Sequence, residues 1–150
     1  METRLLTAND RSEWQRMLLG LYPNSVAADH APSMDAYLTG SSSGELVPAA
    51  VFVVARSDET VGGFLELSVR NYAEGCTGDT PYIESWFVDA DLRRSGAGRA
   101  LMHAAEHWAR EHGYSEIASD ALLDNEISHA AHRALGFEEV ERTVHFRKAL

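Results

Sequence analysis

Three arginines and two glycines lie together in the segment Arg93-Arg94-Ser95-Gly96-Ala97-Gly98-Arg99. Backbone N–H groups at the start of a helix bind a pyrophosphate well, because the helix dipole is positive there. Glycine permits close backbone approach and dihedral angles that a β-carbon disfavours. Arginine adds charge-assisted hydrogen bonds. The segment therefore predicts a pyrophosphate-binding loop.

Other glycine-rich phosphate loops fit this segment less well. A Walker loop ends in Gly-Lys-Ser/Thr, whereas Arg99-Ala100 supplies neither the lysine nor the hydroxyl. A dinucleotide fingerprint needs a third glycine, and Leu101 stands there. A turn that only caps a helix is the plain structural alternative. A strand that ends at Val88 and an amphipathic helix that follows favour the phosphate loop over a simple cap.

Glu84 and Asp120 are carboxylates at the ends of predicted strands. An amine must be neutral to act as a nucleophile, whereas a free amine is mostly protonated near neutral pH. A carboxylate, directly or through water, can accept that proton. Several carboxylates together can also bind ammonium groups. A salt bridge or a helix cap is the structural alternative for either residue.

One histidine motif points to a different chemistry. His103-Ala104-Ala105-Glu106-His107 matches the His-x-x-Glu-His zinc-protease pattern. Its histidines lie opposite the apolar stripe of their helix and should face solvent. His129-x-x-His132 lacks a third ligand at useful spacing. We therefore expect no catalytic metal.

The spacing of hydrophobic residues predicts the helices and strands that would position these residues. Helical spacing predicts helices from Asn9 or Asp10 up to Pro23, over residues 98–112 and 125–135, and a short one with Pro32 in its first turn. β-Branched and aromatic runs predict strands over residues 3–6, 50–56, 61–69, 82–88, 115–119 and 143–148. A flexible connection is expected over residues 39–44 and a long loop over 71–81. This order predicts a single α+β or α/β domain over residues 1–150.

Composition limits the classes of function. The 150 residues carry a formal charge of −10, which disfavours nucleic acid and anionic membranes and attracts cationic small molecules, although solubility alone is the simpler explanation. No window approaches the ~18 apolar residues of a membrane span. The N-terminal residues lack signal-peptide features. The single cysteine, Cys76, excludes an internal disulfide and fits a reducing cytoplasm.

The motif Arg93-x-x-Gly96-x-Gly98 resembles the Arg/Gln-x-x-Gly-x-Gly/Ala signature of the GNAT N-acetyltransferase superfamily. The order of elements over nearly the whole chain and the Leu135-Gly136-Phe137 turn fit that superfamily as well. Residues 82–88, 118–125 and 128–137 resemble bacterial aminoglycoside 6′-N-acetyltransferases more closely. The resemblance implies a mixed, mostly antiparallel sheet that is splayed at the acyl site and flanked by helices.

The resemblance also implies roles for donor-site residues. The strand before the phosphate loop would offer free backbone groups to the pantetheine arm, and one N–H would polarise the thioester carbonyl. Asn125 would lie beside the coenzyme arm and could cap its helix at the same time. The residues implied in coenzyme binding are Trp86, Phe87, Val88, Arg93, Arg94, Ser95, Gly96, Ala97, Gly98, Arg99 and Asn125.

For the acceptor, the resemblance implies an acidic site around a cationic sugar, formed by Tyr22, Tyr72, Glu84, Asp120 and Glu141. Asp120 is the first candidate for proton acceptor and Glu84 the second. Many superfamily members have a tyrosine four residues before the glycine of the Leu-Gly-Phe turn, as acid for the departing thiolate. Here that residue is His132, so this histidine or solvent would donate the proton; a packed or capping histidine is the alternative.

The implied reaction is direct transfer of acetyl from acetyl-CoA to the 6′-amine of an aminoglycoside, with antibiotic resistance as its consequence. A cytoplasmic homodimer is implied too. One alternative is acetylation of another amine, such as a polyamine, an amino sugar or a peptide N-terminus. Another is a non-catalytic acyl-CoA sensor, which the carboxylates Glu84 and Asp120 argue against.

Overall fold

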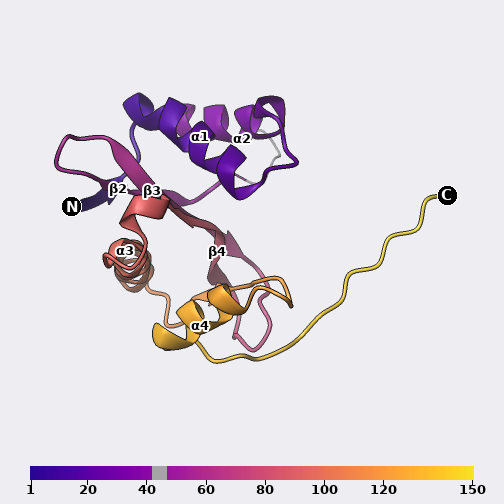
Figure 1. Cartoon of the computed structure of the whole chain (residues 1–150). Coiled ribbons are helices and arrows are strands. Elements are labelled where there is room, and N and C mark those ends of the chain that lie inside the picture. The colour runs from indigo at the N-terminus through magenta and orange to yellow at the C-terminus, as the bar shows by residue number, and fades with distance from the viewer. Residues whose placement is uncertain (42–46) are drawn as a thin grey trace.

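The computed structural model describes residues 1–41 and 47–150, so residues 42–44 of the expected connection lie outside the described part. Within it, five strands form one sheet in the order β1-β2-β3-β4-β5 (Figure 1). The strands are β1 (Glu2–Leu5), β2 (Ala50–Ala55), β3 (Val61–Arg70), β4 (Thr80–Val88) and β5 (Ala118–Ser119). The helices are α1 (Arg11–Leu21), α2 (Ala27–Thr39), α3 (Ala97–Glu111) and α4 (Glu126–Ala134), with short 3₁₀ turns η1 (Ala8–Asp10) and η2 (Ala90–Leu92).

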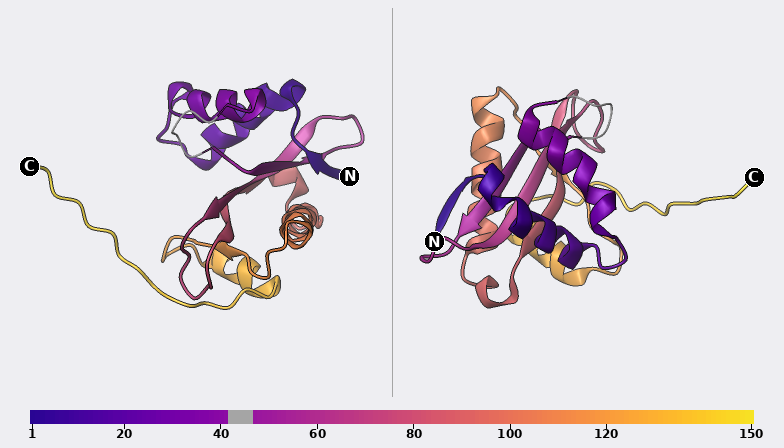
Figure 2. Two further views of the ribbon diagram at one scale, coloured as in Figure 1. Left: turned by 180° about the vertical axis from the view of Figure 1, so that it is seen from behind. Right: turned by 90° about the horizontal axis from the view of Figure 1, so that it is seen from above.

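Helices cover both faces of the sheet. Helices α1 and α2 lie on one face, and α3 and α4 lie on the other (Figure 2). Because successive side chains of a strand point to opposite faces, Phe64 packs with Trp14 on the α1 side and Leu65 packs with Leu101 on the α3 side. The two apolar layers fix the sheet between the helices.

The sheet opens between β4 and β5. Strands β1 to β4 pair antiparallel, whereas β4 and β5 pair parallel through only two residue pairs, Tyr82 with Ala118 and Ile83 with Ser119. On the other edge of β4 the register shifts between Glu66 and Leu67, which leaves Glu84 as an extra, bulged residue. Beyond the bulge, β4 therefore continues to Val88 without β5 beside it. The mixed, splayed sheet confirms the predicted fold class.

Several predicted boundaries were wrong. Helix α2 begins at Ala27, not near Pro32, because the Asp29 carboxylate accepts a hydrogen bond from the Val26 N–H at 2.8 Å and satisfies the helix start there. Strand β4 begins at Thr80, which shortens the predicted loop, and β5 spans two residues instead of residues 115–119.

The predicted strand over residues 143–148 does not form in the single chain. Residues 135–150 contain neither helix nor strand, and the end of the chain runs away from the body (Figure 1). Val144 is 63% exposed and Phe146 is 94% exposed. A strand needs a partner edge for its backbone groups, and the two-residue β5 offers very little. We call residues 138–150 the C-terminal tail.

Candidate functional site

The phosphate loop lies where η2 leads into α3, and its backbone suits an anion. Gly96 is the residue before the helix and has φ +94°, a conformation that favours glycine. Among the described residues, no backbone acceptor is found for the N–H groups of Ala97, Gly98 and Arg99, which form the first turn. These unpaired donors and the positive end of the helix dipole can hold a pyrophosphate.

The arginines of this loop add positive charge. Arg93, Arg94 and Arg99 are exposed, and none forms an ion pair with a carboxylate of residues 1–41 or 47–150. Arg93 Nε donates to the Val88 carbonyl at 3.0 Å and so ties the loop to the end of β4. The guanidinium groups are therefore available to an incoming phosphate.

The two glycines of the motif are needed for different physical reasons. A β-carbon at Gly96 would meet no atom within 4 Å, so only its dihedral angle demands glycine. A β-carbon at Gly98 would lie 3.1 Å from Cζ2 of Trp86. Gly98 thus lets the start of α3 pack closely on β4, the strand whose free edge faces the opening.

Glu84, at the bulge, is held by its neighbours. Its Oε1 accepts from Arg70 Nε at 2.8 Å and from Ser68 Oγ at 2.5 Å, and its Oε2 accepts from Arg70 Nη2 at 2.7 Å. Partial burial raises the pKa of Glu84, but the hydrogen bonds and charge of Arg70 with the Ser68 bond outweigh it and lower the pKa. The salt bridge considered for this residue is present, and Glu84 is a fixed anion.

Asp120, just after β5, has greater freedom. Its Oδ2 accepts from the Tyr82 hydroxyl at 2.6 Å, while Oδ1 accepts from no described residue. Burial, the hydrogen bond to Asp120 and its charge together raise the pKa of Tyr82, so this phenol stays a donor. Arg70 lies over the Tyr82 ring, 3.6 Å from its centroid. Asp120 is thus oriented and exposed, with one oxygen open to a ligand.

Tyr22, at the end of α1, faces the same opening. Its hydroxyl donates to the Glu84 carbonyl at 3.2 Å and lies 3.0 Å from Ser85 Oγ. Burial raises the pKa of Tyr22 against the opposing hydrogen bond of Ser85, and the charges of Glu84 and Asp120 add to that rise. We define the acceptor face as the α1 side of the opening, formed by Tyr22, Glu66, Ser68, Arg70, Tyr82, Glu84, Ser85 and Asp120.

Sequence reasoning missed Glu66, which lies opposite the bulge on β3. Its Oε1 accepts from the indole N–H of the buried Trp14 at 2.8 Å. Burial raises the pKa of Glu66 against the opposing hydrogen bonds of Ser85 and Trp14, which favours the neutral acid. The available signal was a glutamate inside the apolar run of residues 61–67, because buried carboxyls in strands need partners.

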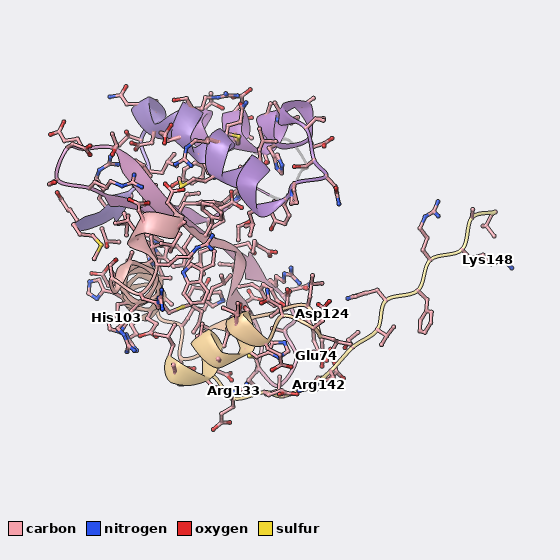
Figure 3. The ribbon with its side chains drawn as sticks, viewed as in Figure 1. Glu74, His103, Asp124, Arg133, Arg142 and Lys148 are labelled. Carbon is pink, nitrogen blue, oxygen red and sulfur yellow. The ribbon has the colours of Figure 1, made fainter. Side chains whose placement is uncertain are left out.

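Tyr72 and Glu141 form a separate group. Tyr72 is 66% exposed on the loop after β3, and its hydroxyl donates to Glu74 Oε2 at 3.0 Å. The hydrogen bond and charge of Glu74 raise the pKa of Tyr72, with a smaller contribution from Glu141. Glu141 belongs to the tail, whose far end at Lys148 lies well away from the body (Figure 3). Within the described part of the chain, no hydrogen bond joins this group to the acceptor face.

The two remaining predicted site residues, Asn125 and His132, belong to α4 and its N-terminal cap. Asn125 Oδ1 accepts from the Ser128 N–H at 3.1 Å, so the capping function of Asn125 is real. His132 Nδ1 lies 2.7 Å from the Ser128 carbonyl, and Nε2 lies 2.8 Å from Ser119 Oγ. The ring is therefore oriented at both nitrogens on the α3 side of the sheet.

The zinc-protease pattern on α3 does not form a site. His103 points away from the body (Figure 3), and His107 pairs with Glu111 one turn later. Across residues 1–41 and 47–150, no cluster of three or more His, Cys, Asp or Glu side chains could hold a metal ion. None of the described helices is long and apolar enough to cross a membrane.

The chain is similar to known proteins over its whole length. The model of the acetyltransferase (GNAT) family matches residues 12–137. Aminoglycoside N(6′)-acetyltransferase type 1 of Klebsiella aerogenes is 40% identical, over 98% of this chain and 95% of that protein. The protein of the same name from Stenotrophomonas maltophilia is 36% identical, over 98% and 92%.

Solved structures agree with these relatives. The apo structure of aminoglycoside antibiotic 6′-N-acetyltransferase AAC(6′)-Ig from Acinetobacter haemolyticus has a TM-score of 0.85 at 34% identity, covering 100% of this chain and 99% of that one. AAC(6′)-Iy in complex with the bisubstrate analogue CoA-S-monomethyl-acetylneamine has a TM-score of 0.86 at 28% identity, covering 99% and 98%.

Proposed function

The chain belongs to the acetyltransferase (GNAT) family, and we propose that it transfers acetyl from acetyl-CoA to the 6′-amine of an aminoglycoside. The observation that carries the proposal is the similarity to aminoglycoside 6′-N-acetyltransferases over at least 98% of the chain. The charge distribution supports it, because exposed arginines lie at the phosphate loop and carboxylates lie on the acceptor face. Antibiotic resistance would follow, since an acetylated amine loses its positive charge.

In the proposed reaction the amine attacks the thioester carbonyl directly. Asp120, whose Oδ1 is open, accepts the amine proton directly or through one water, while Tyr82 fixes the orientation of the carboxylate. Glu84 binds an ammonium group as a fixed anion. Acetyl-CoA enters as co-substrate: residues 93–99 hold its pyrophosphate. Its arm lies beside Asn125 and along the stretch Trp86, Phe87 and Val88, where β4 has no β5 partner and backbone groups on that edge can contact it.

The remaining aromatic and acidic group forms the outer part of the acceptor site in this proposal. An aminoglycoside carries several ammonium groups, so carboxylates beyond the reacting amine add binding energy. The Tyr72 hydroxyl donates to Glu74, the charge of Glu141 adds to the rise in the pKa of Tyr72, and the exposed Tyr72 ring can stack on a sugar. The use of acetyl-CoA and the free thiol at Cys76 support the proposal of a cytoplasmic enzyme.

We propose a homodimer in which the C-terminal tails are exchanged. Val144 and Phe146 are exposed and alternate as in a strand with one apolar face. A groove lined by Cys76, Glu116, Ile117 and Phe137 lies beside β5, which is the edge strand of the sheet. A tail from a second copy would supply that edge with the missing strand. Light scattering should give twice the 16.5 kDa of one chain, and removal of residues 143–150 should give monomers.

The function can be tested by incubating the purified protein with acetyl-CoA and each of a panel of amines. The rate at which free CoA thiol appears measures acetyl transfer. Turnover is expected with kanamycin or tobramycin, and none with analogues that carry a 6′-hydroxyl. If the protein turns over a polyamine, an amino sugar or a peptide N-terminus but no aminoglycoside, the acceptor is that other amine and the proposed substrate is wrong. Tight acetyl-CoA binding without turnover on any amine would indicate a sensor.

A further inference from the structure

We propose that the Ser119 hydroxyl, backed by His132, delivers the proton to the departing coenzyme thiolate. The inference rests on the proposed acetyl transfer and extends it to the leaving-group step. Ser119 is the last residue of β5, and the His132 ring reaches it from α4. Ser119 Oγ and His132 Nε2 are 2.8 Å apart.

The hydrogen bonds of the imidazole fix its direction. His132 Nδ1 lies 2.7 Å from the Ser128 carbonyl, and because a carbonyl only accepts, Nδ1 carries a proton. Nε2 is therefore the nitrogen that exchanges a proton with Ser119. Edge contacts with the rings of Trp86 and Phe137, at centroid distances of 5.6 and 5.2 Å, hold the imidazole in this orientation.

The position of the pair in the sheet matches the leaving-group step. Ser119 pairs with Ile83 at the last register position before β4 and β5 separate. Neighbouring residues of a strand point to opposite faces, so Asp120 meets Tyr82 on the α1 side while Ser119 meets His132 on the α4 side. An acid and a base at adjacent positions thus serve the two faces of one opening, the base toward the amine and the acid toward the coenzyme.

After the amine has attacked and lost its proton, the carbon–sulfur bond breaks and its electron pair passes to sulfur. Sulfur takes the Ser119 hydroxyl proton, and Ser119 Oγ takes the Nε2 proton of His132 protonated at both nitrogens. Asp120 then releases the amine proton to solvent and His132 takes up a proton from solvent, so the cycle balances; Asp120 is exposed and His132 is partly exposed. Ser119 is the donor that touches the reacting atoms, and His132 is a positioning and proton-supplying residue.

A purely structural role is the competing explanation, because the same bond ties β5 to α4. The two roles predict different kinetics. A structural tie would affect folding and coenzyme binding together, whereas a proton donor affects kcat alone. A threonine at position 119 keeps the hydroxyl, so it should keep a donor role as well.

The test compares Ser119→Ala and Ser119→Thr with the wild type, using any amine that the wild type acetylates, so a wrong acceptor assignment does not affect it. We expect Ser119→Ala to lower kcat by ~10- to 100-fold with an unchanged Kd for CoA and an unchanged melting temperature. Ser119→Thr should restore kcat to within a few-fold of wild type, and His132→Gln should lower kcat without weakening CoA binding.

Ser57→Ala and His103→Gln are matched controls, because both side chains are exposed: Ser57 lies in the turn between β2 and β3, and His103 points away from the body (Figure 3). An unchanged kcat in Ser119→Ala would overturn the proposal. So would a loss of kcat that comes with weaker CoA binding and lower stability and that threonine does not restore. If the wild type acetylates another amine but no aminoglycoside, the proposed substrate is wrong. The proton-donor proposal is then decided by the same comparison of Ser119→Ala, Ser119→Thr and wild type with that other amine.

Discussion

The phosphate loop and the acceptor face use charge in opposite ways. At the loop, the guanidinium groups of Arg93, Arg94 and Arg99 are exposed, and none pairs with a carboxylate in the described part of the chain. On the acceptor face, Glu84 is paired with Arg70 and Asp120 accepts from Tyr82. The loop therefore obtains its counter-charge from the ligand, whereas the acceptor face is oriented before any ligand arrives.

This difference fits the role that we propose for each region. A pyrophosphate carries full negative charge and needs only donors on a fixed backbone. The reacting amine must be placed within hydrogen-bond reach of a base, so the base itself must be held by neighbouring groups. Substitutions at the loop should thus change affinity for the coenzyme, and substitutions on the acceptor face should change turnover or the affinity for the amine.

The strongest test of that division is Asp120→Asn. An amide cannot take the amine proton, so kcat should fall by about 10²- to 10³-fold while the KM for acetyl-CoA stays the same. Steady-state kinetics with both substrates varied measures the two effects. Asp124→Asn is the control, since Asp124 is exposed a few residues further along and has no side-chain hydrogen bond within the described residues. Equal losses in kcat and coenzyme affinity would assign Asp120 a structural role.

At the loop, Gly96→Val should give the reverse result. Valine at φ +94° strains or rearranges the backbone that presents the free N–H groups, at about 1–3 kcal/mol. We expect the KM for acetyl-CoA to rise by roughly 10- to 100-fold, which corresponds to that energy, with acceptor binding unchanged by calorimetry.

Gly113→Val is a closely matched control for this substitution. Gly113 has φ +83° at the far end of α3 and also has open space around its β-carbon position. Both variants should lose similar stability in thermal unfolding, but Gly113→Val should keep the wild-type KM for acetyl-CoA. If both raise that KM equally, the effect of Gly96 comes from stability and not from the loop geometry.

The two regions also differ in how far sequence could predict them. The loop is one contiguous segment before a helix, and its conformation is set locally by Gly96, so the motif alone indicated a phosphate site. The acceptor face is assembled from α1, β3, β4 and the residue after β5, which are distant in sequence. Glu84 and Asp120 were identified through a resemblance, but the Arg70 and Tyr82 partners depend on strand register, which no local pattern specifies.

The boundaries show the same division between local and long-range causes. Helices α1, α3 and α4 were predicted to within a few residues because their apolar stripes and end residues are local. The strand over residues 143–148 was wrong for one chain because a strand exists only with a partner edge. Glu66 was not predicted as a site residue for a related reason: its hydrogen-bond partner, Trp14, lies 52 positions earlier in the sequence.

Glu66 provides a finer test of the orientation of the acceptor face. Glu66→Leu removes the acceptor of the buried Trp14 N–H and should lower the free energy of unfolding by about 1–3 kcal/mol. The KM for the aminoglycoside should rise several-fold, because Ser85 and Tyr22 lose a shared support. Glu66→Gln keeps an acceptor for Trp14 and should behave like wild type in chemical denaturation and kinetics. A large loss in Glu66→Gln would instead mean that Glu66 acts as an anion toward the substrate.

The smallest expected effect is a shift in pH dependence through Arg70. In the wild type, Arg70 and Ser68 lower the pKa of Glu84 against the opposing effect of burial, so Glu84 stays an anion as pH falls through the usual glutamate range near ~4.3. Arg70→Met removes the charge and two of the hydrogen bonds, burial then dominates, and the pKa of Glu84 rises. The acid limb of kcat/KM for the aminoglycoside should therefore move to higher pH, while that for acetyl-CoA should not move. Arg11→Met, which breaks the exposed pair with Asp35, should leave both limbs in place. A parallel shift for both substrates would mean that Glu84 also supports the coenzyme side, and the two regions would no longer be independent.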